Sequence, residues 1–231
     1  MLESLSRPEA IFAAARSRAH AAFGQAIEYP DEQFCKDVRA GAVCEALQGV
    51  LATVDPSLLQ EADLSALSDA GEKDDLMVEY TRLFIVGAPG PACPLYGGLY
   101  GGTRNKTLEE LDRFYNHFGL SASKRPSELP DYLGTELEFL HYLAFHEARL
   151  LEAGEDVGSC RRAQRDFLAR HPAAWVPKLR VQLKARKPMR FFAELIRLLE
   201  LFLEHDFAHL VALEGPVPSG SPPSPRSREP S

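Results

Sequence analysis

Apolar residues recur every three or four positions along nearly the whole chain, which is the spacing of helices that bury one face. No segment alternates convincingly between apolar and polar residues, as a half-buried strand would. Glycine and proline separate the periodic segments. The pattern predicts an all-α protein with helices at residues 8–23, 32–54, 58–67, 72–86, 107–118, 131–153, 158–170, 173–187 and 188–213.

Several helix ends carry local signals. Thr107 is followed three residues later by Glu110, which is the form of a capping box. Asp131 directly follows Pro130, where its carboxylate is suited to cap a helix. The signals predict N-caps at Ser6, Thr107 and Asp131 and helix-ending glycines at Gly24, Gly119 and Gly154.

The helix at residues 131–153 carries two apolar stripes, so we expect it to be covered on two sides and to lie centrally. From residue 215 onward the composition changes to proline, serine and glycine. Such a segment buries too little apolar surface to order itself. We therefore predict one helical bundle domain over residues 1–214 and a disordered tail over residues 215–231.

Composition excludes several classes of protein. A net charge of −7 argues against a general nucleic-acid binder, which would present a basic surface. Residues 1–20 hold charges of both signs and no unbroken apolar run, so they do not resemble a secretory signal, and no apolar run is long enough to cross a bilayer. The four cysteines lack C-x-x-C spacing and are predicted to be free thiols. These features predict a soluble, cytoplasmic protein.

Charge is distributed in blocks. Residues 55–79 and 128–156 are strongly acidic, whereas residues 160–190 hold ten Lys and Arg but only one acid, Asp166. The interpretation we favour is that these blocks are solvated faces that attract one another across the fold. The alternative is an acidic surface that attracts a basic peptide.

Sequence motifs for catalysis are absent. The chain has no G-x-x-x-x-G-K-[ST], no G-x-S-x-G and no H-E-x-x-H. One metal pattern is present: an acid and a histidine three residues apart occur twice, as in di-iron carboxylate bundles. This alternative would use Glu138, His141, Asp206 and His209, with Glu45 and Glu79 as further carboxylates. The favoured interpretation is that each is a surface pair or a locally hydrogen-bonded pair, because such spacings arise by chance in an acid-rich chain.

The loop that follows the helix at 72–86 is rich in glycine and proline yet carries Leu95, Tyr96, Leu99 and Tyr100. Aromatic side chains on an irregular backbone indicate either a recognition surface or a loop packed on the core, and we favour recognition. Trp175, the only tryptophan, is predicted to anchor the core, and Cys93 is predicted to be a buried, unreactive thiol.

Four motifs together resemble the TorD/DmsD/NarJ family of redox-enzyme maturation chaperones, and the resemblance spans about residues 75–205. In chain order they are Tyr80-x-x-Leu83-Phe84, Pro94-x-Tyr96-x-x-x-Tyr100, Glu128-Leu129-Pro130-Asp131-Tyr132-Leu133-x-x-x-Leu137-Glu138-Phe139-Leu140 and Phe167-Leu168-x-x-His171-x-x-x-Trp175.

The resemblance implies a cytoplasmic chaperone, not an enzyme, with no cofactor of its own. It implies binding of the apo catalytic subunit of a molybdopterin-dependent, DMSO-reductase-type oxidoreductase and of its twin-arginine leader until the molybdenum cofactor is inserted. It further implies no nucleic acid, no stable membrane insertion, and a monomer or homodimer. The leader is expected to meet aromatic walls and an acidic rim formed by Tyr80, Phe84, Pro94, Leu95, Tyr96, Tyr100, Asp131, Tyr132, Glu138 and Trp175.

The chain departs from the family pattern at two points. Gly97-Gly98 stands where members often carry Glu-Ser, and Asp131-Tyr132 stands where TorD- and DmsD-like members usually have Asp-His. The second feature is closer to NarJ. The mixture predicts a branch of the family that serves a different molybdoenzyme. We expect Gly97-Gly98 to help determine which client enzyme is bound.

Overall fold

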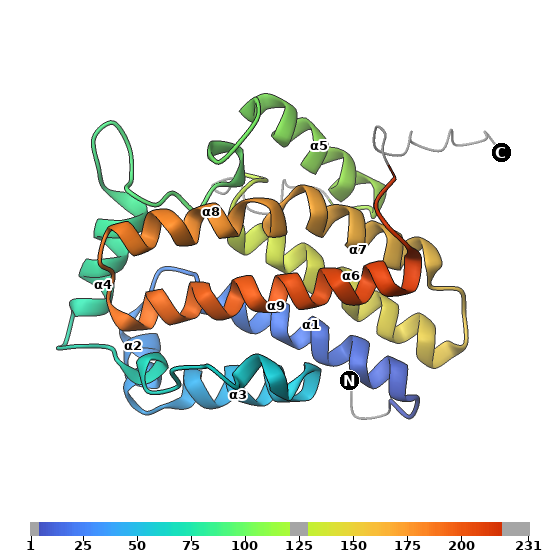
Figure 1. Cartoon of the computed structure of the whole chain (residues 1–231), viewed down its shortest axis with the longest axis horizontal. Helices are drawn as coiled ribbons and strands as arrows, with labels where there is room; N and C mark the ends of the chain where they lie inside the picture. The colour runs from blue at the N-terminus through green and yellow to red at the C-terminus, as the bar shows by residue number, and fades with distance from the viewer. Residues whose placement is uncertain (1–4, 121–128, 219–231) are drawn as a thin grey trace.

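The computed structural model describes residues 5–120 and 129–218, and this part of the chain is built from helices (Figure 1). The α-helices are α1 (Pro8–Ala26), α2 (Glu32–Arg39), α3 (Ala42–Val54), α4 (Asp75–Tyr80), α5 (Arg104–His117), α6 (Leu133–Ala153), α7 (Gly158–Arg170), α8 (Pro172–Ala185) and α9 (Arg190–Glu214). Within the described residues there is no strand, only an isolated antiparallel bridge between Tyr96 and Tyr132. The predicted all-α fold is confirmed.

The helices form a bundle around α1, α6 and α9. Helix α1 packs along α6 and α3, and α9 packs against α7, α8 and α1. In Figure 1, α9 runs through the middle, with α7 and α8 end to end on one side of it and α3 on the other. Helix α6 contacts α1, α7 and α8, as its two apolar stripes predict.

Side-chain size explains the close packing of α1 on α6. Ala13 and Ala14 of α1 are buried against Ala148 of α6, and small side chains let two helix axes approach closely. At the other end of the bundle, larger rings fill the space: Phe23 of α1 stacks on Phe202 of α9, with their centroids 5.6 Å apart. The core is thus alanine-rich at one end of α1 and aromatic at the other.

Three predicted helices are divided or shortened. The predicted helix at 32–54 is two helices, because the chain turns at Gly41, whose φ is +81°. The predicted helix at 58–67 is replaced by the 3-10 turns η1 (Pro56–Leu59) and η2 (Ala66–Ser68). The predicted helix at 72–86 is α4 followed by a π-helical turn, η3 (Thr81–Ile85).

Two predicted N-caps are wrong for the same reason, namely that the chain enters the helix elsewhere. Helix α5 already begins at Arg104, so Thr107 lies within its first turns. The N-cap of α6 is Tyr132, and the carboxylate of Asp131 accepts a hydrogen bond from the backbone of Gly98 instead. Capping of α6 therefore does not explain Asp131.

The remaining terminal signals give mixed results. The Ser6 hydroxyl donates to Glu152 and does not cap α1, and α1 continues past Gly24 to Ala26. Gly119 and Gly154 do end their helices, with φ of +71° and +74°. Both adopt the left-handed conformation in which glycine is favoured.

The predicted tail falls mostly on residues 219–231, which lie outside the described residues. Among the helices that the structure describes, none combines the length and apolar character that crossing a bilayer requires.

Candidate functional site

The glycine-rich loop pairs with the chain just before α6. Leu133 donates its backbone N–H to the carbonyl of Leu95 (2.9 Å), and Gly97 donates to the carbonyl of Asp131 (2.8 Å). The bridge between Tyr96 and Tyr132 lies between these two bonds. The backbone therefore holds the second and third motifs of the chain side by side.

Beneath the loop, Trp175 of α8 is buried and its indole Nε1 donates to Glu136 Oε2 of α6 (2.9 Å). Tyr100 stacks on the indole with a centroid distance of 5.1 Å. A Cβ atom at Gly97 would lie 2.7 Å from Trp175 Nε1 and 3.0 Å from Glu136 Oε1. The structure thus has room only for glycine at position 97, and it confirms Trp175 as a core anchor.

Glu136 is not among the site residues predicted from the sequence. It is fully buried, its Oε1 has no hydrogen-bond partner among the described residues, and burial raises its pKa well above the ordinary value. A signal was present, because Glu136 lies four residues before Leu140 and so falls on the apolar face of α6.

On the outer side of the loop, the Asp131 carboxylate is also fully buried. Its Oδ2 accepts from the Gly98 backbone N–H (3.2 Å) and lies 3.5 Å from Arg104 Nε, whereas its Oδ1 has no partner among the described residues. The Arg104 guanidinium also lies over the ring of Tyr96, 5.8 Å from the centroid. Tyr96 in turn packs against Tyr132 with a centroid distance of 5.7 Å.

The other predicted residues lie mostly on the inner side of this cluster. The Tyr80 hydroxyl donates to the carbonyl of Ile27 (3.0 Å), which also accepts from Tyr132 (3.5 Å). Phe84 packs edge-on against Tyr80, with their centroids 4.9 Å apart. Tyr80, Phe84, Leu95 and Tyr100 are buried, and the half-buried Pro94 accepts from the Tyr100 hydroxyl (2.8 Å).

The loop is therefore largely packed on the core, with Tyr96 half-buried and Leu99 exposed at its surface. Glu138 stands apart: its side chain is exposed on α6. The structure brings nine of the ten predicted residues into one contiguous region around Tyr132. Their role in recognition stays a prediction.

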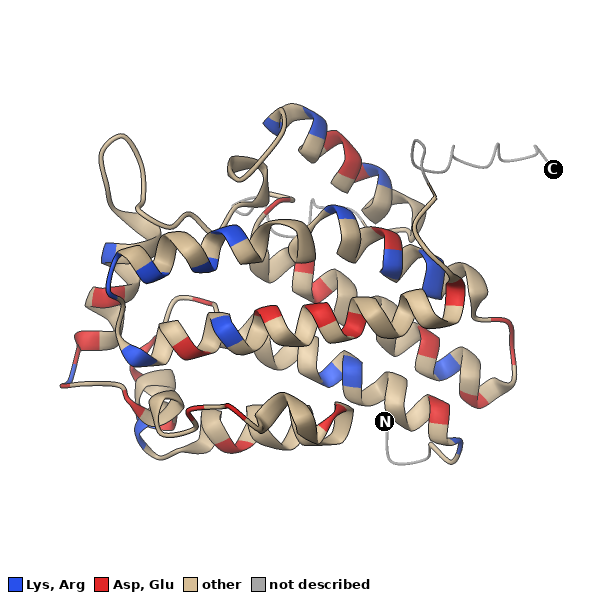
Figure 2. Cartoon of the chain, in the orientation of Figure 1, with Lys and Arg blue, Asp and Glu red and all other residues tan. Residues whose placement is uncertain are grey.

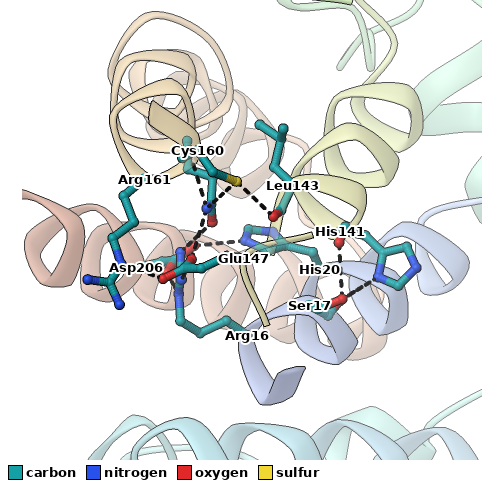
Figure 3. A network of polar contacts seen from close by, with 10 residues as sticks. Arg16, Ser17, His20, His141, Leu143, Glu147, Cys160, Arg161 and Asp206 are labelled. Atoms are coloured by element: carbon teal, nitrogen blue, oxygen red, sulfur yellow. Dashed lines mark hydrogen bonds and ion pairs between the residues drawn. The ribbon is translucent and has the colours of Figure 1, made fainter. Parts of the chain in front are cut away.

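The metal alternative is not supported. His141 Nδ1 hydrogen bonds with the Ser17 hydroxyl (2.8 Å), and Asp206 pairs with Arg16 and His20 (Figure 3). His209 packs edge-on against Phe12. Across residues 5–120 and 129–218, no group of three or more His, Cys, Asp and Glu side chains is arranged to hold a metal ion.

Asp206 belongs instead to a buried ion network that the sequence did not reveal (Figure 3). Arg16 of α1 pairs with Asp206 of α9 and with Glu147 of α6 (2.8 Å), and it donates to Gln164 of α7 (2.8 Å). Burial alone would raise the pKa of Asp206, but the charge of Arg16 and the hydrogen bond from His20 hold that pKa well below its ordinary value. The same opposition lowers the pKa of Glu147.

Comparisons with known proteins cover most of the chain. The family model described as "Nitrate reductase delta subunit" matches residues 41–180. A perchlorate reductase assembly chaperone protein of Dechloromonas aromatica (strain RCB) is 30% identical over 201 residues, which are 85% of this chain and 88% of that protein. A selenate reductase assembly chaperone protein of Thauera selenatis is 35% identical over 183 residues, 78% and 80% of the two chains. A chaperone protein TorD of Vibrio parahaemolyticus is 26% identical over 152 residues, 64% and 70% of the two chains.

Proposed function

Because the chain belongs to the TorD/NarJ family of redox-enzyme maturation proteins, we propose that it is an assembly chaperone for the catalytic subunit of a molybdenum-dependent oxidoreductase. One observation carries the proposal: relatives that align over most of both chains are named assembly chaperones of perchlorate and selenate reductases. The protein acts by binding and catalyses no reaction. It holds the apo subunit in the cytoplasm until the molybdenum cofactor is inserted.

The proposed contact region lies where the glycine-rich loop pairs, at residues 95–97, with the chain just before and at the start of α6, at residues 131–133. A twin-arginine leader combines positive charge with an apolar stretch, so it suits a surface that offers both a carboxylate and aromatic rings. Tyr96 and Leu99 supply apolar surface, the buried Tyr132 packs beneath Tyr96, and Asp131 supplies the carboxylate for an arginine. The exposed Glu138 adds negative charge farther along α6. The buried Tyr80, Phe84, Leu95, Tyr100 and Trp175, with the half-buried Pro94, form the base that positions these groups.

Affinity capture from the native host tests both the function and its site. We expect the tagged chain to retain a reductase catalytic subunit that carries a twin-arginine leader and lacks molybdenum, identified by mass spectrometry and metal analysis. The variant Tyr96→Ala with Asp131→Asn should retain about tenfold less, since hydrogen bonds to a charged group contribute roughly 1.5–3 kcal/mol.

A variant that loses the same side-chain types elsewhere is the control. Glu45→Gln with Tyr142→Ala removes an exposed carboxylate and a partly exposed ring on α3 and α6, and should retain the subunit as the wild type does. Capture of no reductase subunit above a tag-only control would contradict the proposed function. Equal capture by the folded Tyr96/Asp131 variant would contradict only the site.

A further inference from the structure

The carboxylate of Asp131 is under-satisfied for a buried charge. It receives one hydrogen bond, from Gly98 N–H at 3.2 Å, while Oδ1 has no partner among the described residues. Burying a carboxylate is unfavourable unless several donors compensate for the lost water. The Asp131 carboxylate can therefore accept further hydrogen bonds that the described residues do not supply.

The group that covers this carboxylate is Arg104, the first residue of α5. Its Nε lies 3.5 Å from Asp131 Oδ2, and this Nε makes no hydrogen bond within the described residues. The stem of Arg104 passes so close to Gly98 that a Cβ there would lie 2.8 Å from Arg104 Cγ and 2.9 Å from Asp131 Oδ2. Glycine at position 98 is what lets the guanidinium reach the carboxylate.

Arg104 is held only weakly at the Asp131 carboxylate, for two reasons. A guanidinium opposite a carboxylate normally donates two parallel hydrogen bonds at about 2.7–2.9 Å, and Arg104 makes neither. Its side chain is also 39% exposed. Arg104 is therefore already partly hydrated, and little of its contact with the protein is lost when it moves fully into water. The second element of the site, the face of Tyr96 under the guanidinium, is present and half-buried.

We propose that Asp131 and Tyr96 form a guanidinium site that Arg104 occupies as an internal competitor, and that an arginine of the bound partner enters by displacing it. This inference rests on the proposed function and names the chemical group that its site accepts. The incoming guanidinium uses the free Oδ1 together with Oδ2, and takes the place of Arg104 over the Tyr96 ring. A lysine cannot substitute, because an ammonium presents no planar fork and stacks less well.

The exchange has a consequence that an ordinary structural ion pair would not have. Removal of Arg104 removes the competitor, so the affinity for an arginine-containing peptide should rise. The ion pair is long (3.5 Å) and its Arg104 side is 39% exposed, so this weak pair and one cation–π contact set the scale of the competition, which predicts an increase of about threefold to tenfold.

Calorimetric titration tests this with a synthetic peptide that carries two consecutive arginines before an apolar segment. Arg104→Gln is expected to bind it about threefold to tenfold more tightly than the wild type does. Arg104→Lys, which keeps the charge but loses the fork, should fall between the two. The control is Arg113→Gln, which removes an exposed arginine from the same helix and should leave the affinity unchanged. A peptide with two lysines should bind more weakly to every one of these proteins.

The outcomes separate the exchange from the proposed function. If Asp131→Asn weakens binding but Arg104→Gln leaves it unchanged or weakens it, the exchange is wrong and the proposed site stands. If Arg113→Gln tightens binding as much as Arg104→Gln, the effect is one of overall charge and the exchange is again wrong. If neither the wild type nor Arg104→Gln binds the peptide, no guanidinium site exists, whatever the capture experiment shows. Thermal unfolding of each variant verifies that it is folded.

Discussion

At the scale of single residues, His171 is notable for an imidazole that is buried among aromatic rings. The ring packs edge-on against Phe114 (centroids 5.6 Å apart) and in a tilted arrangement against Phe167 (4.8 Å). Neither ring nitrogen has a hydrogen-bond partner among the described residues. Burial, assisted by the charge of Arg170, lowers the pKa of His171 to about 3. The folded protein therefore keeps this histidine neutral throughout the range in which an ordinary histidine becomes charged.

This neutral histidine makes stability depend on pH. As the pH falls below about 6.5, the unfolded chain binds a proton at residue 171 and the folded chain does not, so acid favours unfolding. Between pH 6.5 and pH 5 the wild type should lose about 2 kcal/mol of unfolding free energy more than His171→Phe does. Urea unfolding at the two pH values measures this difference. His117→Phe, which replaces an exposed histidine on α5, is the control, and an equal loss in wild type and His171→Phe would contradict the prediction.

Glu136 acts in the opposite direction. Because burial raises its pKa, the folded chain holds a proton there that the unfolded chain releases, so this residue lowers stability as the pH rises above about 4.5. The effect is present in the wild type and in His171→Phe alike and cancels in their difference. Comparison of matched variants, not the raw pH profile of the wild type, therefore isolates the histidine.

At the scale of helices, Gly41 separates α2 from α3 through its backbone alone. A Cβ at this position would meet only Ser68 Oγ at 3.8 Å, which is ordinary contact, but φ is +81°. Gly41→Ala should therefore destabilise the protein by about 1 kcal/mol. Gly49→Ala, inside α3 with no atom within 4 Å of the added methyl group, should instead stabilise it by about 0.5–1 kcal/mol. Urea midpoints that shift in the same direction for both variants would contradict this account.

Helix content was predictable because helical periodicity is a local property. Helix boundaries were less so where a distant group claims the capping side chain. Asp131 after Pro130 has every local feature of an N-cap, yet its carboxylate accepts from Gly98, 33 residues away in sequence. Gly41 lies in a segment whose helical apolar spacing continues on both sides. The break between α2 and α3 depends on the positive φ of Gly41, which the spacing of apolar residues does not reveal.

The candidate site divides in the same way. Tyr96, Asp131, Tyr132 and Trp175 were predicted because they belong to motifs. Arg104 was not, since it lies in a polar segment and its partner is 27 residues away in sequence. Glu136 was missed although it falls on the apolar face of α6, because the helix holds several acids and the sequence alone does not say which of them is buried.

At the scale of the whole molecule, Lys and Arg of the basic block lie along α7 and α8 (Figure 2), and the block forms an ion pair with each acidic block, although Glu147 is buried and so is not part of a solvated face. Arg161 of the basic block pairs with Glu147 of one acidic block at 2.6 Å, and Arg190 pairs with Asp63 of the other at 2.8 Å. The first of these pairs extends the buried network around Arg16. That network joins α1, α6, α7 and α9, and so connects the helices that form the centre of the bundle.

Loss of Arg16 should therefore weaken the entire bundle. Arg16→Met keeps much of the side-chain volume but leaves the buried carboxylates of Asp206 and Glu147 without their shared cation, which is expected to cost about 3–5 kcal/mol of unfolding free energy. Arg18→Met, on the exposed side of α1, should change it by no more than about 0.5 kcal/mol.

The unpaired charge, not the lost contact, is the main source of this expected cost. Adding Asp206→Asn to Arg16→Met removes one of the stranded charges, so the double variant should be less destabilised than the sum of the two single variants. Urea unfolding of the four proteins in the cycle measures the difference. Strict additivity would mean that Arg16 and Asp206 stabilise the bundle independently, and that the network does not join α1 to α9 energetically.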